Sequence, residues 1–509
     1  MAEMTNTLRQ GRAVRTLVAL AALTALQACS LTPVYQRPEP AVPANLAGVD
    51  AASAPASAAS SPAVAELPWR TYFPDARLQS LICEALANNR DLRVAILNIE
   101  QLRAAYQIQR ADQFPTVNGS LSGTRQPATT SPYRLGTQVT GGLVVPSFEL
   151  DLFGRVQALS DAAAAQVLAS EEARRATHIS LVASVASSYY TLWADRWQLA
   201  LAEQTLATRQ DSLKLQQLKF DNGVLNELDL RSAQSLVESA RVARVQAQRQ
   251  SAQDLQALAL LVGRPIPAEW LPPQTDVVLA DSAKDPARFV QDSLWPGLSE
   301  LPVGLSSDVL LQRPDVAQAE QLLISANANI GAARAARFPR IALTSSAGVA
   351  SNSLSSLFDA GRFAWSFGGS LTAPIFDAGR TAAGVDSAKV KRDIAIAQYD
   401  KAVQTAFREV ADALVARRTY AEQADAQLAQ AQAEAARLKL STLRYDNGVA
   451  SQLDLLDAQR ALFTAQQAHI SAQLQRQLAH IGVYKALGGG WAEAGQQVDV
   501  REATPSGVR

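Results

Sequence analysis

The sequence predicts a mixed α/β membrane protein in which one half is duplicated and each half combines very long helices with a pair of short strands. The duplication is visible in Phe220–Gln234 and Tyr445–Gln459, which share the pattern Asp-Asn-Gly-Val-x-x-x-Leu-Asp-Leu-x-x-Ala-Gln at an offset of 225 residues. A repeat has to be recognised before a fold is assigned. Two further observations support this fold class: a proline-free helical stretch precedes each copy, and strand-like segments of about ten residues precede each stretch.

Charge and composition exclude several classes of function. Lys and Arg together number 47, as do Asp and Glu, so the formal net charge is zero. No nucleic-acid partner is expected, because such binding depends on basic surface. The three histidines lack metal-ligand spacing. We find no nucleophile paired with a base, no phosphate-binding glycine loop and no metal cluster, so the sequence predicts neither an enzyme nor a cofactor.

The N-terminus predicts export from the cytoplasm. Three arginines precede an apolar run over residues 17–26 that is too short to span a membrane comfortably, as is typical of a signal peptide, here residues 1–28. The run ends in Leu26-Gln-Ala-Cys29, which resembles the lipobox of bacterial lipoproteins. That resemblance implies a diacylglycerol thioether on Cys29 and an acyl chain, such as palmitate, on its amino group. An ordinary cysteine within a signal peptide is the alternative.

The segment after Cys29 predicts a lipidated tether. Residues 29–74 are rich in Ala, Pro and Ser, a composition typical of flexible linkers. Residue 30 is Ser, whereas inner-membrane retention in lipoproteins tends to need Asp there, so the resemblance implies sorting to the outer membrane.

Two proline-terminated helical stretches lead into strands. The first is predicted over residues 75–113 and the second from about Asp308. They stop at Phe114-Pro115 and Phe338-Pro339, because proline cannot continue a helix. The hydrophobic period then changes to two, which predicts β-hairpins at about 116–147 and about 341–375. Segments of about ten residues fit transmembrane strands, although soluble hairpins packed on a core are the alternative. Four strands cannot close a barrel and an open edge cannot face lipid, so membrane strands here require an oligomer.

Each hairpin leads into a helical stretch of about 66 residues, or on the order of 100 Å. This length favours an extended coiled-coil wall over a compact core. Turns at about 221–226 and about 446–451 reverse the chain, and helices return to Gly263 and Gly488. The expected organisation is a first repeat over 75–263, a proline-rich connector over 264–307, a second repeat over 308–490 and a C-terminal tail over 491–509.

Six motifs are spread over nearly the whole exported chain: Leu26-Gln-Ala-Cys29, Pro146-Ser-Phe-Glu-Leu-Asp-Leu-Phe-Gly-Arg155, Leu310-Leu-Gln-Arg-Pro-Asp-Val-Ala-Gln-Ala-Glu320, Ala335-Ala-Arg-Phe-Pro-Arg340, Tyr445-Asp-Asn-Gly448 and Leu453-Asp-Leu-Leu-Asp-Ala-Gln-Arg460. In sequence and in order they resemble those of the TolC-like outer-membrane factors, most of all the NodT-type lipoprotein branch that works with resistance–nodulation–division (RND) pumps. One departure is Gln312, where the family usually has arginine.

The resemblance implies a homotrimer. Three chains of four strands would build a twelve-stranded outer-membrane β-barrel, and their long helices would build a periplasmic α-barrel. The implied function is an exit duct for drugs or other small toxic compounds. The implied partners are a periplasmic adaptor (membrane fusion) protein, an inner-membrane RND pump and outer-membrane lipid. The open alternatives are a duct for heavy-metal efflux or type I protein secretion and, in another class, a periplasmic coiled-coil lipoprotein without a pore.

The resemblance places a periplasmic aperture at Leu453, Asp457, Arg460 and Asp454, where Leu453 and Asp457 match the family's rings. Three symmetry-related carboxylates at a constriction favour cations, and a leucine ring excludes water. Comparison of the two copies separates these roles from helix capping. Asp454 and its equivalent Asp229 each follow an N-cap residue by three positions, so we interpret them as mainly structural. Asp457 and Arg460 correspond to serines in the first copy, and capping does not require them.

The tip turns contain Asn222, Gly223, Asn447 and Gly448. Gly or Asn in the left-handed conformation ends a helix, so these residues are expected to form the turns themselves. The resemblance implies a second role for the same residues as contacts for the adaptor.

Overall fold

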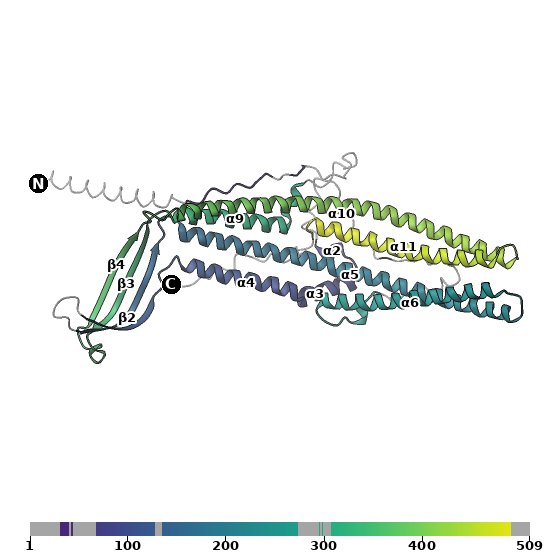
Figure 1. The fold of residues 1–509 in the computed structure, drawn as a ribbon, viewed down its shortest axis with the longest axis horizontal. Coiled ribbons are helices and arrows are strands. Elements are labelled where there is room, and N and C mark those ends of the chain that lie inside the picture. The colour runs from purple at the N-terminus through teal and green to yellow at the C-terminus, as the bar shows by residue number, and fades with distance from the viewer. Residues whose placement is uncertain are drawn as a thin grey trace. The chain divides into compact units, whose positions relative to one another are not determined.

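The computed structural model of the chain describes residues 31–39, 42–43, 68–127, 135–272, 295, 298 and 307–489. The chain forms two compact units, each assembled from separated parts of the sequence. Two helices of 67 residues, α5 (Arg155–Asp221) and α10 (Arg380–Asp446), contribute to both units (Figure 1). Unit 1 comprises Met1–Pro40, Leu97–Glu172 and Ala317–Ala402, and unit 2 comprises Ala41–Ile96, Ala173–Val316 and Val403–Arg509.

Unit 1 contains one four-stranded antiparallel sheet in which each strand pairs with the next along the chain. The β2–β3 pairing joins the hairpin of one repeat to the hairpin of the other. Its register shifts between Val145 and Phe148, where Pro146 has no N–H to donate to the ladder. The strands are β1 (Asn118–Pro127), β2 (Leu135–Leu150), β3 (Arg340–Ser351) and β4 (Phe363–Thr372), with a short 3-10 turn, η5 (Leu354–Ser356), between β3 and β4.

The helices that lead into the strands are α4 (Arg90–Ala111) and α9 (Pro314–Ala335). Both end shortly before the Phe-Pro pairs that the sequence marked as helix stops. At this junction in unit 1 the rings of Phe153 and Phe338 stack with centroids 4.6 Å apart. The stack holds the chain that leaves β2 against the chain that enters β3.

The segment over residues 31–39 differs from the expected flexible tether. Residues 31–39 lie extended beside α9 in unit 1 (Figure 1). Tyr35 and Arg37 both hydrogen-bond Glu320 of that helix. A Pro- and Ala-rich composition indicates flexibility only while the side chains find no partner, and here two of them do.

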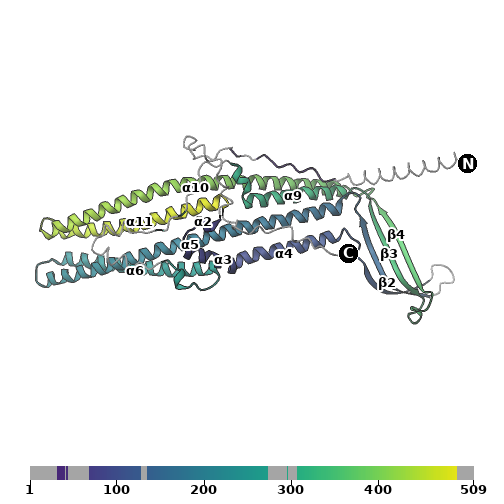
Figure 2. The ribbon, with the colours of Figure 1, turned by 180° about the vertical axis from the view of Figure 1, so that it is seen from behind.

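Unit 2 contains two antiparallel helix pairs, α5 with α6 (Glu227–Val262) and α10 with α11 (Gln452–Ala486), which lie side by side in both views (Figures 1 and 2). Leu206 of α5 packs on Val237 and Ala240 of α6, and Ala431 of α10 packs on Ala465 of α11. Such small side chains allow the close helix contact of a coiled coil. The remaining elements described in this unit are α2 (Trp69–Tyr72), α3 (Ala76–Asn88), η3 (Ala268–Trp270) and η4 (Ser307–Gln312).

The first helical stretch is broken, whereas the sequence predicted one helix over residues 75–113. Asn89 separates α3 from α4 in an extended conformation, with φ −61° and ψ 131°. Its Oδ1 accepts a hydrogen bond from the backbone N–H of Leu92, and its Nδ2 donates one to the carbonyl of Leu261, 172 residues away. Asn89 therefore begins α4 as an N-cap. The second repeat also differs, because α9 starts at Pro314 rather than near residue 308.

The duplication is plain in the backbone. Helices α5 and α10 end 225 residues apart, at Asp221 and Asp446. Left-handed glycines recur at the same offset, at Gly154 and Gly379, Gly223 and Gly448, and Gly263 and Gly488. The predicted fold class, a duplicated half with very long helices and four strands per chain, is confirmed.

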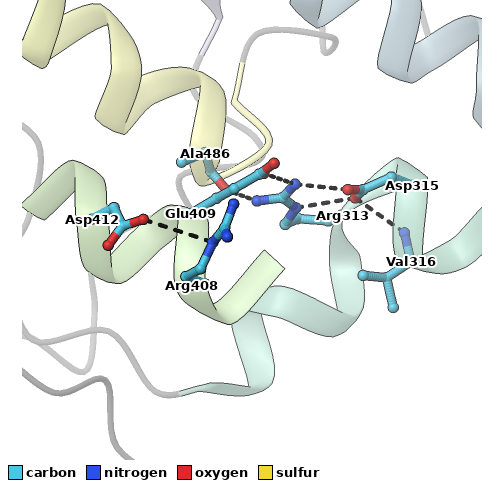
Figure 3. A network of polar contacts seen from close by, with 7 residues as sticks. All are labelled: Arg313, Asp315, Val316, Arg408, Glu409, Asp412 and Ala486. Carbon is cyan, nitrogen blue, oxygen red and sulfur yellow. Dashed lines mark hydrogen bonds and ion pairs between the residues drawn. The ribbon is translucent and has the colours of Figure 1, made fainter. Parts of the chain in front are cut away.

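Arg313 is a polar hub within unit 2 (Figure 3). Its Nη1 donates to the carbonyl of Ala486 at 2.6 Å, and its Nη2 lies 2.7 Å from carboxylate oxygens of both Asp315 and Glu409. The side chain thereby connects the start of α9 to the middle of α10 and the end of α11. Gly488 packs on Arg313 at the same point, where an added Cβ would lie 3.3 Å from Cγ.

Several expectations lie outside the described residues. They are the signal peptide (1–28), the lipidated Cys29, most of the tether and of the connector, and the tail after residue 490. No helix among the described residues combines the length and the apolar character needed to cross a membrane.

Candidate functional site

The two tip turns have the same backbone structure. In the first, the N–H of Gly223 donates to the carbonyl of Phe220 at 2.8 Å and that of Val224 to Lys219 at 2.9 Å. The second repeats the pattern from Gly448 and Val449, at 3.0 and 2.8 Å. This pair of bonds defines a Schellman motif, which needs a residue in the left-handed region. Gly223 and Gly448 have φ values of 73° and 71° and meet that need.

The two turn asparagines close the helix ends. Asn222 Nδ2 donates to the carbonyl of Leu218 at 2.7 Å, and Asn447 Nδ2 donates to that of Leu443 at 2.6 Å. Each of these carbonyls in the last helical turn also accepts from the backbone N–H of the same asparagine, at 3.2 Å. The asparagine side chains therefore have a structural role in each tip.

The helices that leave the turns are capped as the sequence indicates. Asn226 Oδ1 accepts from the N–H of Asp229 at 2.9 Å, and Ser451 Oγ accepts from that of Asp454 at 3.2 Å. In the second copy Asp454 Oδ2 also accepts from the Ser451 N–H, which completes a capping box. Hydrogen bonds from the Ser451 side chain and backbone lower the pKa of Asp454. The geometry of Asp454 is that of a cap.

The other aperture candidates share one exposed face of α11. Leu453, Asp457 and Arg460 are spaced by four and three residues, which places them on one side of a helix, and all three are exposed. Leu455 and Leu462, on the opposite side of the helix, are buried. This outward face is therefore the part of α11 that is open to another chain or to a channel.

Asp457 has a partner that sequence reasoning missed. Arg437 of α10 places Nη2 2.5 Å from Asp457 Oδ2 and Nη1 3.1 Å from Glu434 Oε2. Arg437 corresponds to Ser212 at the 225-residue offset, just as Asp457 corresponds to Ser232. The signal that separated Asp457 from a helix cap, a charge in place of a serine of the first copy, is thus also present at Arg437. The ion pair ties α10 to α11 in the second tip alone.

Each tip exposes an equivalent apolar patch. The first tip patch is defined by four side chains of the first repeat, and the second tip patch by their equivalents 225 residues on. All eight side chains are more than half exposed. Leu453 belongs to the second patch, so its exposure does not by itself distinguish an aperture from a docking surface. The two patches are Leu215, Leu218, Val224 and Leu228, and Leu440, Leu443, Val449 and Leu453.

One side-chain contact joins the two tips of the chain. Lys219 Nζ, near the end of α5, donates to Tyr445 Oη at 3.2 Å and lies 5.1 Å from the centroid of that ring. Tyr445 corresponds to Phe220 in the first copy, which lacks a hydroxyl group. An equivalent hydrogen bond to the Phe220 side chain cannot form. The contact therefore runs only from Lys219 at the end of α5 to Tyr445 at the end of α10.

A carboxyl pair lies between α5 and α6 in unit 2. Burial, followed by the hydrogen bond and the charge of Asp254, raises the pKa of Asp195 to about 8. Gln250 Nε2 donates to Asp254 Oδ2 at 3.0 Å. The folded chain thus holds a proton on Asp195 at a pH where an unfolded chain releases it.

This pair predicts a pH-dependent stability with a definite sign. A folded-state pKa raised above the unfolded value stabilises the fold at low pH, and that contribution is lost as pH rises from about 4 to about 8. We expect the thermal unfolding temperature, followed by circular dichroism, to fall between about pH 5 and about pH 9. Asp195→Asn should flatten this dependence. An equal slope in the wild type and in the variant would show that the pair does not titrate in this range.

The geometry of the described residues indicates no reaction centre. Among them, no group of three or more His, Cys, Asp and Glu side chains is placed to hold a metal ion. The tips are distinguished by exposed apolar patches, an ion pair and turns that reverse the chain between helices. These features suit the binding of another protein and the opening of a channel rather than the catalysis of a reaction.

Comparison with known proteins gives consistent matches. The model of the outer membrane efflux protein family matches residues 81–264 and 305–489. The toluene efflux pump outer membrane protein TtgC and the antibiotic efflux pump outer membrane protein ArpC, both of Pseudomonas putida, are each 45% identical over 491 residues, which cover 95% of this chain and 97% of the relative. The crystal structure of the open state of the MtrE outer membrane channel of Neisseria gonorrhoeae superimposes with a TM-score of 0.79 at 39% identity, over 91% of this chain and 99% of that one.

Proposed function

Because this chain belongs to the outer membrane efflux protein family, we propose that it forms the outer-membrane exit duct of a tripartite RND-type efflux system. Members of the family are efflux channels and not enzymes. The proposed cargo is drugs or other small toxic compounds, the class to which the toluene and antibiotics in the relatives' names belong. The duct works passively, and the pump supplies the energy.

The open sheet of unit 1 is the observation that carries this proposal. Its strands of 10, 16, 12 and 10 residues are long enough to cross a bilayer. The outer edges of β1 and β4 lack partners among the described residues, and unpaired backbone groups cannot remain in lipid. On β4 the exposed side chains of Phe363, Trp365 and Phe367 alternate along one face. A homotrimer pairs every edge in a twelve-stranded β-barrel and turns such faces toward lipid.

The tip patches support docking of a periplasmic adaptor. Contiguous exposed apolar side chains usually mark an interaction surface, and each tip presents an equivalent set. A trimer therefore presents six similar patches around one end of a threefold channel. Asn222, Gly223, Asn447 and Gly448 form the turns between the patch residues, and we assign them to the adaptor contact for that reason.

The exposed face of α11 supports an aperture. Three copies of Leu453, Asp457 and Arg460 around a threefold axis form an apolar ring followed by charged rings, which together restrict and select ions. The Arg437–Asp457 pair holds this face on α10 of the same chain. Asp454 lies three residues before Asp457 and forms the capping box with Ser451. We therefore propose that it supports the aperture structurally.

The lipid anchor completes the proposal. Cys29 is the proposed attachment site, with the signal peptide removed before it and the chain held in the outer membrane by acyl chains as well as by the barrel. Metabolic labelling with a palmitate analogue tests this directly, since Cys29→Ser is expected to abolish the label.

Conductance in planar bilayers tests the duct and the aperture together. We expect the wild-type trimer to conduct with a preference for cations, and Asp457→Ala to lower the ratio of cation to anion permeability severalfold, because the carboxylate ring is lost. Ser232→Ala is the matched control at the equivalent position of the first repeat, and it should leave the ratio unchanged. Absence of conductance from folded protein contradicts the duct and favours a structural lipoprotein. Equal selectivity in Asp457→Ala and the wild type removes Asp457 from the aperture.

A further inference from the structure

The sheet of unit 1 has an apolar face and a polar face. Successive residues of a strand point to opposite faces, and residues paired across strands share a face. The polar face carries the hydroxyl pairs Ser122–Thr140 and Ser346–Ser366, each with its oxygens 2.7 Å apart. In the proposed barrel the apolar face contacts lipid and the polar face lines the lumen. The apolar face carries Leu121, Leu143, Val349, Phe363, Trp365 and Phe367.

Two glycines show that the sheet folds toward its polar face. Gly142 and Gly348 lie opposite each other on that face, and a Cβ added to either would be 2.6 Å from the Cα of the other. On the apolar face, the atom nearest to a Cβ added to Gly141 would be 3.3 Å away. The polar face is therefore concave and the apolar face convex, which is the curvature that a water-filled barrel requires.

The loop that joins β3 to β4, residues 352–362, lies on the convex face of β2. Its Leu357 is fully buried, and the Cδ2 of this side chain would be 3.6 Å from a Cβ added to Gly141. Val139, two residues before Gly141 on the same face, is buried as well. An apolar side chain of the β3–β4 loop thus packs on the apolar face of the sheet, on the side away from the lumen.

Hydrogen bonds hold the β3–β4 loop in this position. The hydroxyl group of Ser356 bonds that of Ser351 at the end of β3, and bonds that of Ser353 at 2.7 Å. At the base of the loop, the N–H of Ala350 donates to the carbonyl of Arg362 at 3.0 Å. The loop is therefore a folded element with a defined place on the sheet.

Two apolar side chains of the β3–β4 loop remain exposed. Leu354 and Phe358, which lie on either side of Leu357 in the sequence, are 66% and 85% exposed. Exposed apolar surface is unfavourable in water, and neighbouring side chains of this kind mark contact with another apolar surface. Because the loop lies on the convex face, that surface is outside the barrel.

The length of β4 places the loop at an edge of the membrane. At a strand tilt of about 40°, the ten residues of β4 rise about 25 Å, which is the height of the apolar band of a membrane barrel. Phe363, at the start of β4, therefore lies at one edge of that band, where aromatic side chains are enriched. Helix α10 follows the other end of β4, and the proposed duct places α10 in the periplasm. The edge at Phe363 is therefore the outer one.

We propose that the β3–β4 loop is a membrane contact, in which Leu354 and Phe358 enter the outer leaflet of the lipid bilayer while Leu357 holds the loop on β2. The loop thereby adds apolar surface outside the barrel instead of covering its mouth. This inference rests on the proposed function in taking the sheet as part of a membrane barrel.

Nitroxide probes on trimers reconstituted in lipid vesicles test the contact. Phe358→Cys carries the probe, in a chain in which Cys83→Ser removes the free thiol of the described residues. The Cys83→Ser chain without Phe358→Cys gives the background. Oxygen concentrates in the bilayer interior, whereas a water-soluble nickel complex stays in water. The ratio of the two collision rates therefore measures exposure of the probe to lipid.

Probes on the two faces of β4 supply the controls. We expect the oxygen-to-nickel ratio at residue 358 to be severalfold higher than that at Ser366→Cys on the polar face, and to approach that at Phe367→Cys on the apolar face. An equal ratio at residues 358 and 366 would show water around the loop and overturn the proposal. Low collision rates with both reagents at residue 358 would show a protein contact and would overturn it as well. If residue 367 also gave the ratio of residue 366, the barrel of the proposed function would fail together with the loop contact.

The role of Leu357 is tested with the same probe at residue 358. We expect Leu357→Ser to lower the oxygen-to-nickel ratio severalfold, because the loop then leaves β2. Asp359→Ser is the matched control, since it introduces the same side chain at an exposed position of the same loop, and it should leave the ratio unchanged. The amount of folded trimer is measured for both variants, so that a failure to assemble is distinguished from release of the loop. A trimer of Leu357→Ser that keeps the high ratio would overturn the docking of the loop through Leu357.

Discussion

Arg313→Ala is expected to lower the free energy of unfolding by about 3 kcal/mol, near the lower end of the range for breaking a buried ion pair. Arg313 itself is only 7% exposed, and its removal strands the carbonyl of Ala486 and the carboxylate of Glu409. The Asp315 and Glu409 side chains are 42% and 46% exposed, so water recovers part of their solvation. The loss is therefore smaller than for a fully enclosed pair.

Thermal unfolding followed by circular dichroism measures this effect, and Figure 3 supplies the control. Arg408 lies one residue from Glu409, but its ion pair with Asp412 is 3.8 Å long and both side chains are more than 70% exposed. Arg408→Ala should change stability by less than about 0.5 kcal/mol. Arg313→Lys should lie between the two alanine variants, because lysine keeps the charge but lacks the planar fork. Equal effects of the two alanine variants would mean that Arg313 is not a hub.

The elements that the sequence predicted well are those with local signals. The ends of α5 and α10 follow from an Asp-Asn-Gly turn that is present twice, and the start of β3 follows from Pro339. Such a signal lies within a few residues of the feature that it predicts, so the prediction does not depend on contacts with distant parts of the chain. The break at Asn89 shows the limit, because the amide of Asn89 is held by Leu261 in a distant helix, and nothing near Asn89 in the sequence indicates that contact.

The same distinction applies to the candidate site. Asp457 was proposed by resemblance, and comparison of the two copies separated it from the caps. That comparison also distinguishes Arg437 from Ser212, but only the structure shows that Arg437 and Asp457 meet. Leu453 was placed in an aperture ring by resemblance, whereas its equivalence to Leu228 links it equally to the tip patches. Residues 31–39 were interpreted as part of a flexible tether because their partners on α9, Glu320 and Asn327, lie 285 and 294 residues further along the chain than Tyr35 and Pro33.

Gly348→Val is expected to prevent formation of the sheet that joins the two repeats. Gly142 and Gly348 are directly opposite in the β2–β3 register. A Cβ on Gly348 would lie 2.6 Å from the Cα of Gly142 and overlap the carbonyl oxygen of Gly141. Both are backbone atoms, which cannot rotate away as a side chain can. The overlap is therefore relieved only if β2 and β3 move apart. The cost is about 3 kcal/mol or more, at the upper end of over-packing.

The amount of folded trimer in outer-membrane fractions measures this prediction, with resistance to unfolding in detergent as a second readout. Gly348→Ala should reduce the trimer as well, because the overlap arises at Cβ and not at the larger side chain. Gly123→Ala is the control, since Gly123 lies in β1 and an added Cβ there meets nothing within 4 Å. Normal trimer from Gly348→Ala would mean that β2 and β3 can move apart without loss of the barrel. The close approach of the two glycines would then be no requirement for joining the repeats.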